Sequence, residues 1–261
     1  MRDYKEVTKE RYERDDFSGI GIAKNMYSCI NPIGNYGAYK ETQLLRSYIK
    51  QLVAITHKNL DEIKVLDAGC GNGLVTRLVS NLLGNASNVY GFEYSENRLN
   101  YCRSMNGNIH YKWGNLVEAI PYFDEDGRVF DGIMAFDVLS HFRVEEDILS
   151  ALDNIYSRLT DNGLFLWYDL NAKTHYERLE ADTQGFSSRE MEFYARKSGF
   201  EEVKKAGYYR NISIGKRSMS IYYMAREHNM FWLELLEKIL FPLEYTINIR
   251  VYKKRLKQLI N

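Results

Sequence analysis

The sequence feature that most constrains the fold is a short apolar segment that runs directly into a glycine-rich turn. The segment covers residues 63–67, and Gly69, Gly71 and Gly73 follow it at alternate positions. An apolar run of this length predicts a strand buried on both faces of a parallel sheet. Because glycine lacks a Cβ atom, these positions let the backbone turn sharply and approach a ligand closely.

A helix and a second strand are predicted after this turn. The helix begins at Leu74 and ends before Gly84, a residue suited to a helix C-terminus. The second strand covers residues 88–92 and leads into Glu93, twenty residues beyond Gly73. In a nucleotide-binding βαβ unit, a ribose-binding carboxylate lies at about this distance from the glycines. Together these elements predict a nucleotide-type ligand at the N-terminus of the helix.

The glycine turn resembles a motif of a known family. Residues 65–73 read Val-Leu-Asp-Ala-Gly-Cys-Gly-Asn-Gly, which resembles the first motif of the class I S-adenosylmethionine-dependent methyltransferases. The resemblance extends over residues 40–226 and implies an α/β fold with a doubly wound, mostly parallel seven-stranded sheet. Helical additions are expected at the N-terminal and C-terminal ends. The alternative is a nucleotide-free α/β domain with a tight glycine turn.

The rest of the chain alternates between apolar segments of strand length and segments with helical periodicity. This alternation predicts right-handed crossovers and a parallel sheet. Two strands near residues 202–209 and 218–225 resemble the closing antiparallel hairpin of the family. The other strands are expected at residues 109–113, 129–136 and 164–169, and the helices at residues 95–105, 144–159 and 188–197.

Three parts are predicted along the chain. Residues 1–57 form an N-terminal cap and helix, in which a cluster of turn-forming residues at 31–37 precedes the helix. Residues 58–228 form the S-adenosylmethionine-binding catalytic domain. Residues 229–261 form an amphipathic and basic C-terminal tail.

Two interpretations of the tail stay open. An apolar face within residues 231–240 precedes a basic stretch at residues 250–257 that contains no acidic residue. Apolar side chains followed by cations are suited to a membrane surface with anionic headgroups. Glu234, Glu237 and Glu244 dilute the basic character of this region, which favours packing of the tail on the domain or on a second subunit.

Composition restricts the partners and the compartment. Lysine plus arginine and aspartate plus glutamate both number 35, so a nucleic-acid partner, which favours a basic excess, is not expected. The three cysteines lack C-x-x-C spacing and predict neither a disulfide framework nor a zinc site. The N-terminus has no apolar signal region, and no apolar run approaches the length of a membrane span. We therefore expect a cytoplasmic protein, with any peripheral membrane contact made through the tail.

The resemblance implies that S-adenosylmethionine is the cofactor and S-adenosylhomocysteine the product. Asp67 and the backbone around Gly71 would lie near the methionine end, and Glu93 would bind the ribose hydroxyls by a charge-assisted contact. Asn115 stands where the family often has an acid, and its side-chain carbonyl can still accept a hydrogen bond from the adenine. The predicted cofactor-binding residues are Asp67, Gly69, Cys70, Gly71, Glu93, Tyr94, Asn115, Leu116 and Phe136.

Three side chains near the ends of the fourth and fifth strands are candidates for catalysis. Asp137 opens a run, Asp-Val-Leu-Ser-His, that resembles the family's fourth-strand motif and ends at His141. An oxygen acceptor must lose its proton, and His141 is the best general base by type because histidine titrates near neutral pH. Asp137 and Asp169 end neighbouring strands, where open α/β sheets bind ligands. The alternatives are a structural histidine, and carboxylates that only cap helices or support neighbouring side chains.

The N-terminal segment supplies the candidates for substrate contact. In the resembling family, a segment like this one lies over the cofactor and helps to shape the acceptor pocket. Tyr36, Tyr39 and Lys40 are therefore predicted to contact the substrate; the alternative is that they only cap the core.

The expected function is methyl transfer from S-adenosylmethionine to a small-molecule or glycan-type acceptor, with oxygen as the favoured atom. The sequence contains no Asn-Pro-Pro-Tyr run of the kind expected for adenine methylation and no Pro-Cys pair of the kind expected for C5-cytosine methylation. Asp161 and Asn162 precede the fifth strand rather than follow it, so no metal is expected. An RNA methyltransferase and a non-catalytic cofactor-binding scaffold are the alternatives.

Overall fold

The computed structural model describes most of the central part of the chain. The described ranges are residues 32–105, 107–123, 129–171, 184–208, 212–214, 217–219 and 247–255, together with residues 6, 10, 13, 127 and 235. Only the backbone is described for residues 32–38, 208, 212–214 and 217–219.

The main sheet of the described part has seven strands in the order β3-β2-β1-β4-β5-β9-β6. Strands β1 to β5 pair in parallel, and β9 is antiparallel to both β5 and β6. The predicted seven-stranded, mostly parallel sheet is therefore confirmed. The strands are β1 (Val65–Ala68), β2 (Val89–Glu93), β3 (His110–Trp113), β4 (Phe130–Phe136), β5 (Leu159–Leu170), β6 (Phe200–Tyr208) and β9 (Ile247–Lys254).

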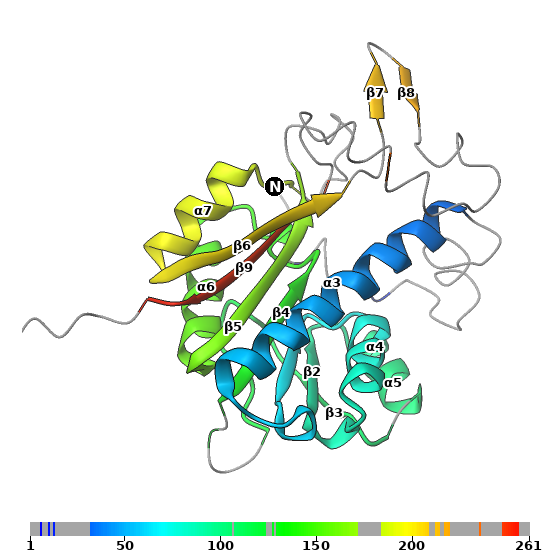
Figure 1. Cartoon of the computed structure of the whole chain (residues 1–261), viewed down its shortest axis with the longest axis vertical. Helices are drawn as coiled ribbons and strands as arrows, with labels where there is room; N and C mark the ends of the chain where they lie inside the picture. The colour runs from blue at the N-terminus through cyan, green and yellow to red at the C-terminus, as the bar shows by residue number, and fades with distance from the viewer. Residues whose placement is uncertain are drawn as a thin grey trace, which may run out of the picture.

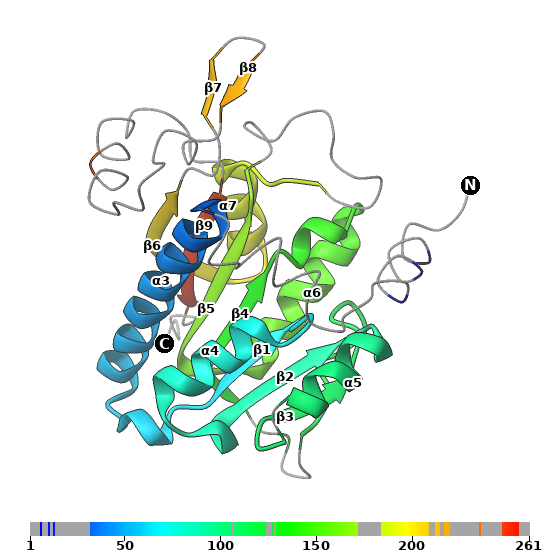
Figure 2. The ribbon, with the colours of Figure 1, turned by 90° about the vertical axis from the view of Figure 1, so that its right-hand side faces the viewer.

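Helices cover both faces of this sheet (Figures 1 and 2). The first face packs α3, α4 and α5 against the sheet, and the second packs α6 and α7. The helices are α3 (Pro32–Thr56), α4 (Leu74–Leu83), α5 (Glu96–Met105), α6 (Glu145–Arg158) and α7 (Ser188–Lys197). The short 3₁₀ helices are η1 (Leu60–Glu62), η2 (Ala86–Asn88) and η3 (Leu139–His141).

Local sequence signals set several helix boundaries. Helix α4 ends at Gly84, whose φ of 70° is left-handed and whose N–H donates to Ser80 O, as predicted. Helix α7 begins after Ser187, whose hydroxyl and the Glu190 carboxylate form a reciprocal capping box. The predicted turn cluster at residues 31–37 is wrong, because helix α3 already begins at Pro32. Proline fits the first helical turn, where its missing N–H would have no intrahelical partner.

The C-terminal strand β9 corrects the prediction for the tail. Residues 247–254 were predicted to lie outside the fold, but they occupy a place between β5 and β6. The side chain of Arg250 is 1% exposed, and its Nε lies 3.1 Å from Glu202 Oε2. Within the described residues, the basic stretch thus belongs to a strand that is buried up to Tyr252, and three of its cations pair with acids of the domain. The other pairs are Lys253 with Glu201 and Lys254 with Asp161.

The predicted closing hairpin is also partly wrong. A strand near residues 202–209 is confirmed as β6, but its partner in the sheet is β9. Strands β7 (Ile212–Ile214) and β8 (Arg217–Met219) instead pair with each other in a separate two-stranded sheet. Of the predicted apolar face at residues 231–240, only Leu235 lies within the described residues. None of the helices described here is long and apolar enough to cross a membrane.

Candidate active site

The glycine turn between β1 and α4 adopts a backbone that favours glycine at three positions. Gly69, Gly71 and Gly73 have φ values of 74°, 56° and 73°, all in the left-handed region. A Cβ atom on Gly69 would lie 2.7 Å from Val138 Cγ2, and one on Gly73 would lie 2.9 Å from Cys102 Sγ. A Cβ atom on Gly71 would meet nothing nearer than Arg98 Nη1 at 3.7 Å. The turn is therefore tightly packed at its two ends and open at its centre.

Glu93, at the end of β2, holds the turn through backbone N–H groups. Its Oε2 accepts a hydrogen bond from Gly71 N at 2.8 Å, and its Oε1 accepts from Tyr94 N and Ser95 N, each at 2.9 Å. Three such donors fix the orientation of the carboxylate. The side chain is buried at the strand end where a ribose-binding acid was predicted. The main chain closes the same junction, since Gly69 N and Cys70 N both donate to Phe92 O.

Asp67 points from β1 towards the first turn of α4. Its Oδ2 accepts a hydrogen bond of 2.7 Å from Thr76 Oγ1, and the side chain is 1% exposed. Burial raises the pKa of Asp67 to about 7; the Thr76 hydrogen bond opposes this shift and the Glu93 charge adds to it. Thr76 is a site residue that the sequence analysis missed. Its position two residues after the predicted helix start was the available signal, because hydroxyl side chains there can bond to a preceding acid.

The predicted adenine side of the site lies at the ends of β2 and β3. Asn115 Oδ1 accepts from Val117 N at 3.1 Å, and Asn115 Nδ2 donates to Glu118 Oε1 at 2.9 Å. Leu116 is buried beside it. The Tyr94 ring lies 5.8 Å from that of Trp113, whose Nε1 donates to Tyr94 O at 2.8 Å. The structure thus gathers Glu93, Tyr94, Asn115 and Leu116 at one end of the sheet.

Two carboxylates meet at the ends of β4 and β5. Asp137 has a left-handed φ of 51°, and its N–H donates to Tyr168 O at 2.9 Å. Asp169 is fully buried and accepts a hydrogen bond of 2.8 Å from Trp167 Nε1. Burial, and then the charge of Asp137, raise the pKa of Asp169 well above its usual range, and nearby Ser140 partly opposes this. A non-glycine residue with positive φ stores backbone strain, which is often found at functional sites.

The remaining candidates lie on η3, at the end of β4 and on α3. His141 is half-buried on η3, four residues after Asp137, and its N–H donates to Val138 O at 3.1 Å. The ring of Phe136 stacks on that of Tyr168 at 4.6 Å. Tyr39 and Lys40 are half-buried in the N-terminal part of α3, whereas the side chain of Tyr36 lies outside the described residues.

The structure adds Glu41 and Tyr168 to this side of the site. Tyr168 Oη donates to Glu41 Oε1 at 2.9 Å, and both side chains are buried. This contact joins the N-terminal part of α3 to the end of β5, as the crossing of α3 over the sheet in Figure 1 illustrates. Glu41 lies three and four residues before the buried Leu44 and Leu45, so an acid on an apolar helical stripe was the signal that could have identified it.

The fold and the glycine turn are those of the class I S-adenosylmethionine-dependent methyltransferases, and the chain contains a domain of this family. Residues 66–165 match the model of a family described as "Methyltransferase domain". That stretch contains most of β1, the glycine turn, Glu93 and the end of β4. The predicted family is confirmed.

Two relatives match part of the chain, and solved structures share its fold. A mitochondrial ubiquinone biosynthesis O-methyltransferase of Dictyostelium discoideum is 28% identical over 109 residues, which cover 38% of this chain and 33% of the relative. Its counterpart in Mus musculus is 31% identical over 88 residues, covering 32% and 23%. The chain thus spans about a third or less of the length of these two relatives.

The solved structures show the fold over nearly the whole chain. Magnesium protoporphyrin IX methyltransferase from Synechocystis PCC 6803, with bound S-adenosylmethionine, has a TM-score of 0.58 at 15% identity and covers 97% of this chain and 98% of that one. N-methyltransferase NodS from Bradyrhizobium japonicum WM9, with bound S-adenosylhomocysteine, has a TM-score of 0.57 at 13% identity and covers 97% and 99%.

Proposed function

We propose that the protein transfers a methyl group from S-adenosylmethionine to the oxygen of a small-molecule acceptor, a class that includes glycan-type molecules. The observation that carries the proposal is the glycine turn held by Glu93, with the Asp137–Asp169 pair at the ends of the neighbouring strands. The matched relatives are named as O-methyltransferases of ubiquinone biosynthesis, which supports a small acceptor and an oxygen atom.

The residues around the turn fit the cofactor of the family. The space that a side chain on residue 71 would occupy is open, because residue 71 is glycine, and this space can admit a ligand. Glu93 supplies a carboxylate for the ribose hydroxyls, and Asp67 supplies a buried carboxyl group near the methionine end. When bound, S-adenosylmethionine supplies a methyl group activated by its positive sulfur. The protein then has to hold the acceptor in line and exclude water, and such positioning supplies much of the rate.

On the acceptor side, we assign different roles to the two carboxyl groups. Asp169 is fully buried and its pKa is raised, so it stays protonated to a higher pH than an exposed aspartate does. Its role is to support Asp137. Asp137 is half-buried and is therefore the member of the pair that can contact an acceptor. His141 follows on the same loop and takes the acceptor proton as general base. Tyr39 and Lys40, in the N-terminal part of α3, would then line the acceptor side.

A labelling experiment tests the acceptor class. The protein is incubated with S-adenosylmethionine carrying a labelled methyl group and with separated cell fractions of small molecules, glycans, lipids, RNA and protein. We expect the label in the small-molecule or glycan fraction and its chemical linkage to be an ether or ester. Label in RNA would support the RNA methyltransferase instead, and no label in any fraction would support a cofactor-binding scaffold.

A matched pair of variants then tests the base. With the labelled fraction as acceptor, His141→Asn should lower turnover by about a hundredfold or more, because asparagine cannot take up the proton. Affinity for S-adenosylhomocysteine, measured by calorimetry, should not change. His57→Asn, at the exposed residue that follows the C-terminal end of α3, is the control and should keep full turnover. Near-normal turnover in His141→Asn would move the proton-accepting role to Asp137.

A further inference from the structure

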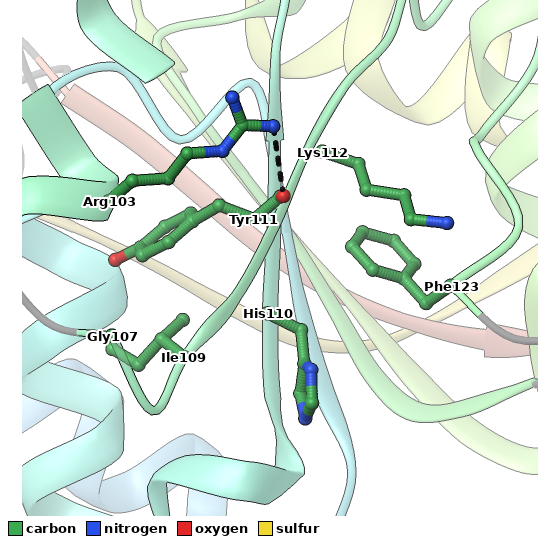
Figure 3. Close-up of a pocket in the computed structure, with 7 residues that line it drawn as sticks. All are labelled: Arg103, Gly107, Ile109, His110, Tyr111, Lys112 and Phe123. Atoms are coloured by element: carbon green, nitrogen blue, oxygen red, sulfur yellow. Dashed lines mark hydrogen bonds between the residues drawn. The ribbon is translucent and has the colours of Figure 1, made fainter. Parts of the chain in front are cut away.

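A hollow separate from the methyl-transfer site lies along the free edge of the sheet. It has a volume of about 310 Å³ and is formed by the C-terminal part of α5, the residues of β3 and the segment that follows β3 (Figure 3). Among the described strands, β3 is the edge strand and pairs only with β2. The volume is at the lower end of the range of ligand pockets, which is roughly 300 to 1,000 Å³.

Arg103, Lys112 and His110 line this hollow, and within the described residues each of them contacts a main-chain carbonyl group. Arg103 Nη2 donates to Tyr111 O at 3.4 Å, and Lys112 Nζ donates to Tyr122 O at 2.6 Å. His110 Nε2 lies 3.0 Å from Ser87 O. A carbonyl oxygen carries only a partial charge, so these contacts orient the cations without neutralising them. Figure 3 shows Arg103 on one side of β3 and Lys112 on the other.

An aromatic ring completes the hollow beside these cations. Lys112 Nζ lies over the Phe123 ring, 5.8 Å from its centroid. Phe123 also packs edge-on against Tyr90 at 5.2 Å, and Tyr90 stacks with the His110 ring at 4.8 Å. The ring is therefore held in place by its neighbours and offers an apolar surface next to the basic groups.

We propose that this hollow binds a ligand that carries a phosphate group next to a flat ring. The phosphate would contact Lys112, which lies on the same side of β3 as Phe123, because an ammonium group is a usual partner of phosphate oxygens. Arg103 would add its positive charge from the other side of the strand. The flat part would lie on Phe123, as bases stack on aromatic side chains. A nucleotide has both parts, and it could be free or belong to an RNA strand.

The hollow is separated from the cofactor turn by the side chain of Tyr111. That side chain is buried, and its hydroxyl oxygen would lie 2.9 Å from a Cβ atom placed on Gly73. A ligand of the hollow thus meets the outer edge of β3, while the cofactor meets the opposite end of the glycine turn. Binding at the hollow should therefore persist when the cofactor site is filled.

A simpler explanation is that the cations only protect an edge strand from pairing with another chain. Asp124, Glu125 and Asp126 follow Phe123 in the sequence and would weaken any general attraction for anions. Under this explanation no saturable binding occurs. The two explanations can be separated by titration.

The experiment is calorimetry on the full chain, with the cofactor site saturated by S-adenosylhomocysteine. The probes are uridine monophosphate, pyrophosphate, uridine and a short uridine oligonucleotide. We expect saturable binding of uridine monophosphate, weaker binding of pyrophosphate and none of uridine. Oligonucleotide binding tighter than that of the monophosphate would identify an RNA strand as the source, and equal or weaker binding would identify a free nucleotide.

Variants decide whether the binding occurs at the hollow. Arg103→Met combined with Lys112→Met should weaken uridine monophosphate at least tenfold and leave S-adenosylhomocysteine affinity unchanged. Phe123→Ala should weaken uridine monophosphate but not pyrophosphate. The control, Arg46→Met with Lys50→Met on the exposed side of α3, removes the same charge and should have no effect. Absence of saturable binding, or equal losses in the control, would overturn the proposal.

Discussion

The ends of β1 and β2, which we assign to the cofactor, and the ends of β4 and β5, which we assign to the acceptor, are built in different ways. At the ends of β1 and β2, the Glu93 carboxylate accepts hydrogen bonds from three backbone N–H groups. One donor lies in the glycine turn and two directly follow β2. At the ends of β4 and β5, Asp169 accepts a hydrogen bond from the Trp167 side chain, lies close to Ser140 and faces the charge of Asp137. The first arrangement depends on backbone geometry, whereas the second depends on which side chains distant segments bring together.

This difference predicts how substitutions divide between the two ends. A contact made by backbone groups survives most changes in the surrounding side chains. A cluster of side chains changes with each of its members and with the strands that carry them. Conservative substitutions should therefore alter acceptor choice far more readily than cofactor affinity.

The largest effect should follow removal of β9. Deletion of residues 247–261 removes a strand that pairs with both β5 and β6 and buries Ile247, Ile249 and Val251. Domains are stable by only about 5–15 kcal/mol, so this loss should abolish cooperative unfolding. The measurement is thermal unfolding followed by circular dichroism.

A shorter deletion is the control for β9. Removal of residues 256–261 leaves the whole strand in place and should preserve the unfolding transition. If the longer deletion still unfolded cooperatively and bound S-adenosylhomocysteine with unchanged affinity, the acceptor half would not be needed to support the cofactor half.

An intermediate effect is expected from the titration of Asp67. Its folded pKa of about 7 is above its ordinary value of 3.8, so the folded protein binds the proton more tightly than the unfolded chain does. The free energy of unfolding should therefore fall as pH rises from about 4 to about 7. At 1.36 kcal/mol per unit, the fall is on the order of 4 kcal/mol.

Asp67→Asn should remove this part of the pH dependence. Asparagine still offers a carbonyl oxygen to Thr76 but cannot ionise, so the variant should be more stable than the parent above pH 7. Urea unfolding at several pH values measures the difference, and the exposed Asp61→Asn is the control. Parallel stability curves for the parent and Asp67→Asn would contradict the raised pKa.

The smallest effect of the three concerns cofactor affinity. Glu93→Ala removes a charged acceptor of hydrogen bonds and should weaken S-adenosylmethionine binding by about 1.5–3 kcal/mol, roughly 10- to 150-fold. Calorimetry compares this variant with Glu96→Ala, which removes the same charge at an exposed position. The difference between the two affinities is then due to the position of Glu93. Equal affinity in the two variants would remove Glu93 from the ribose site.

The cofactor half could be predicted from sequence because its signals are local. The glycine turn, the end of α4 at Gly84 and the acid at the end of β2 lie within about thirty residues of one another, and each has a direct backbone cause. The Thr76 contact with Asp67 is the one part of this half that no motif indicated.

The acceptor half could be predicted only in part. Asp137 and Asp169 were identified from their places at strand ends, and the structure brings them together. Glu41 and Tyr168 were missed, because their hydrogen bond joins residues 127 positions apart. No local pattern records such a contact.

Strand β9 was missed for a different reason. Ile247, Ile249 and Val251 alternate with Asn248 and Arg250, which is the two-residue period of a strand. The prediction did not use this period, because Arg250 and the basic residues near it were interpreted as solvated charges. In the sheet, Glu202 lies beside Arg250 and allows the cation to be buried.

The place of β9 also bears on how the chain folds during synthesis. Its neighbour β5 ends at Leu170, but the strand that covers its edge is completed only at Lys254. At the usual speed of translation, some 80 residues correspond to roughly 4–16 s. During that interval the long, apolar β5 has a free edge, and nascent chains on one messenger are close neighbours. We expect newly made protein to need chaperone protection until β9 emerges from the ribosome.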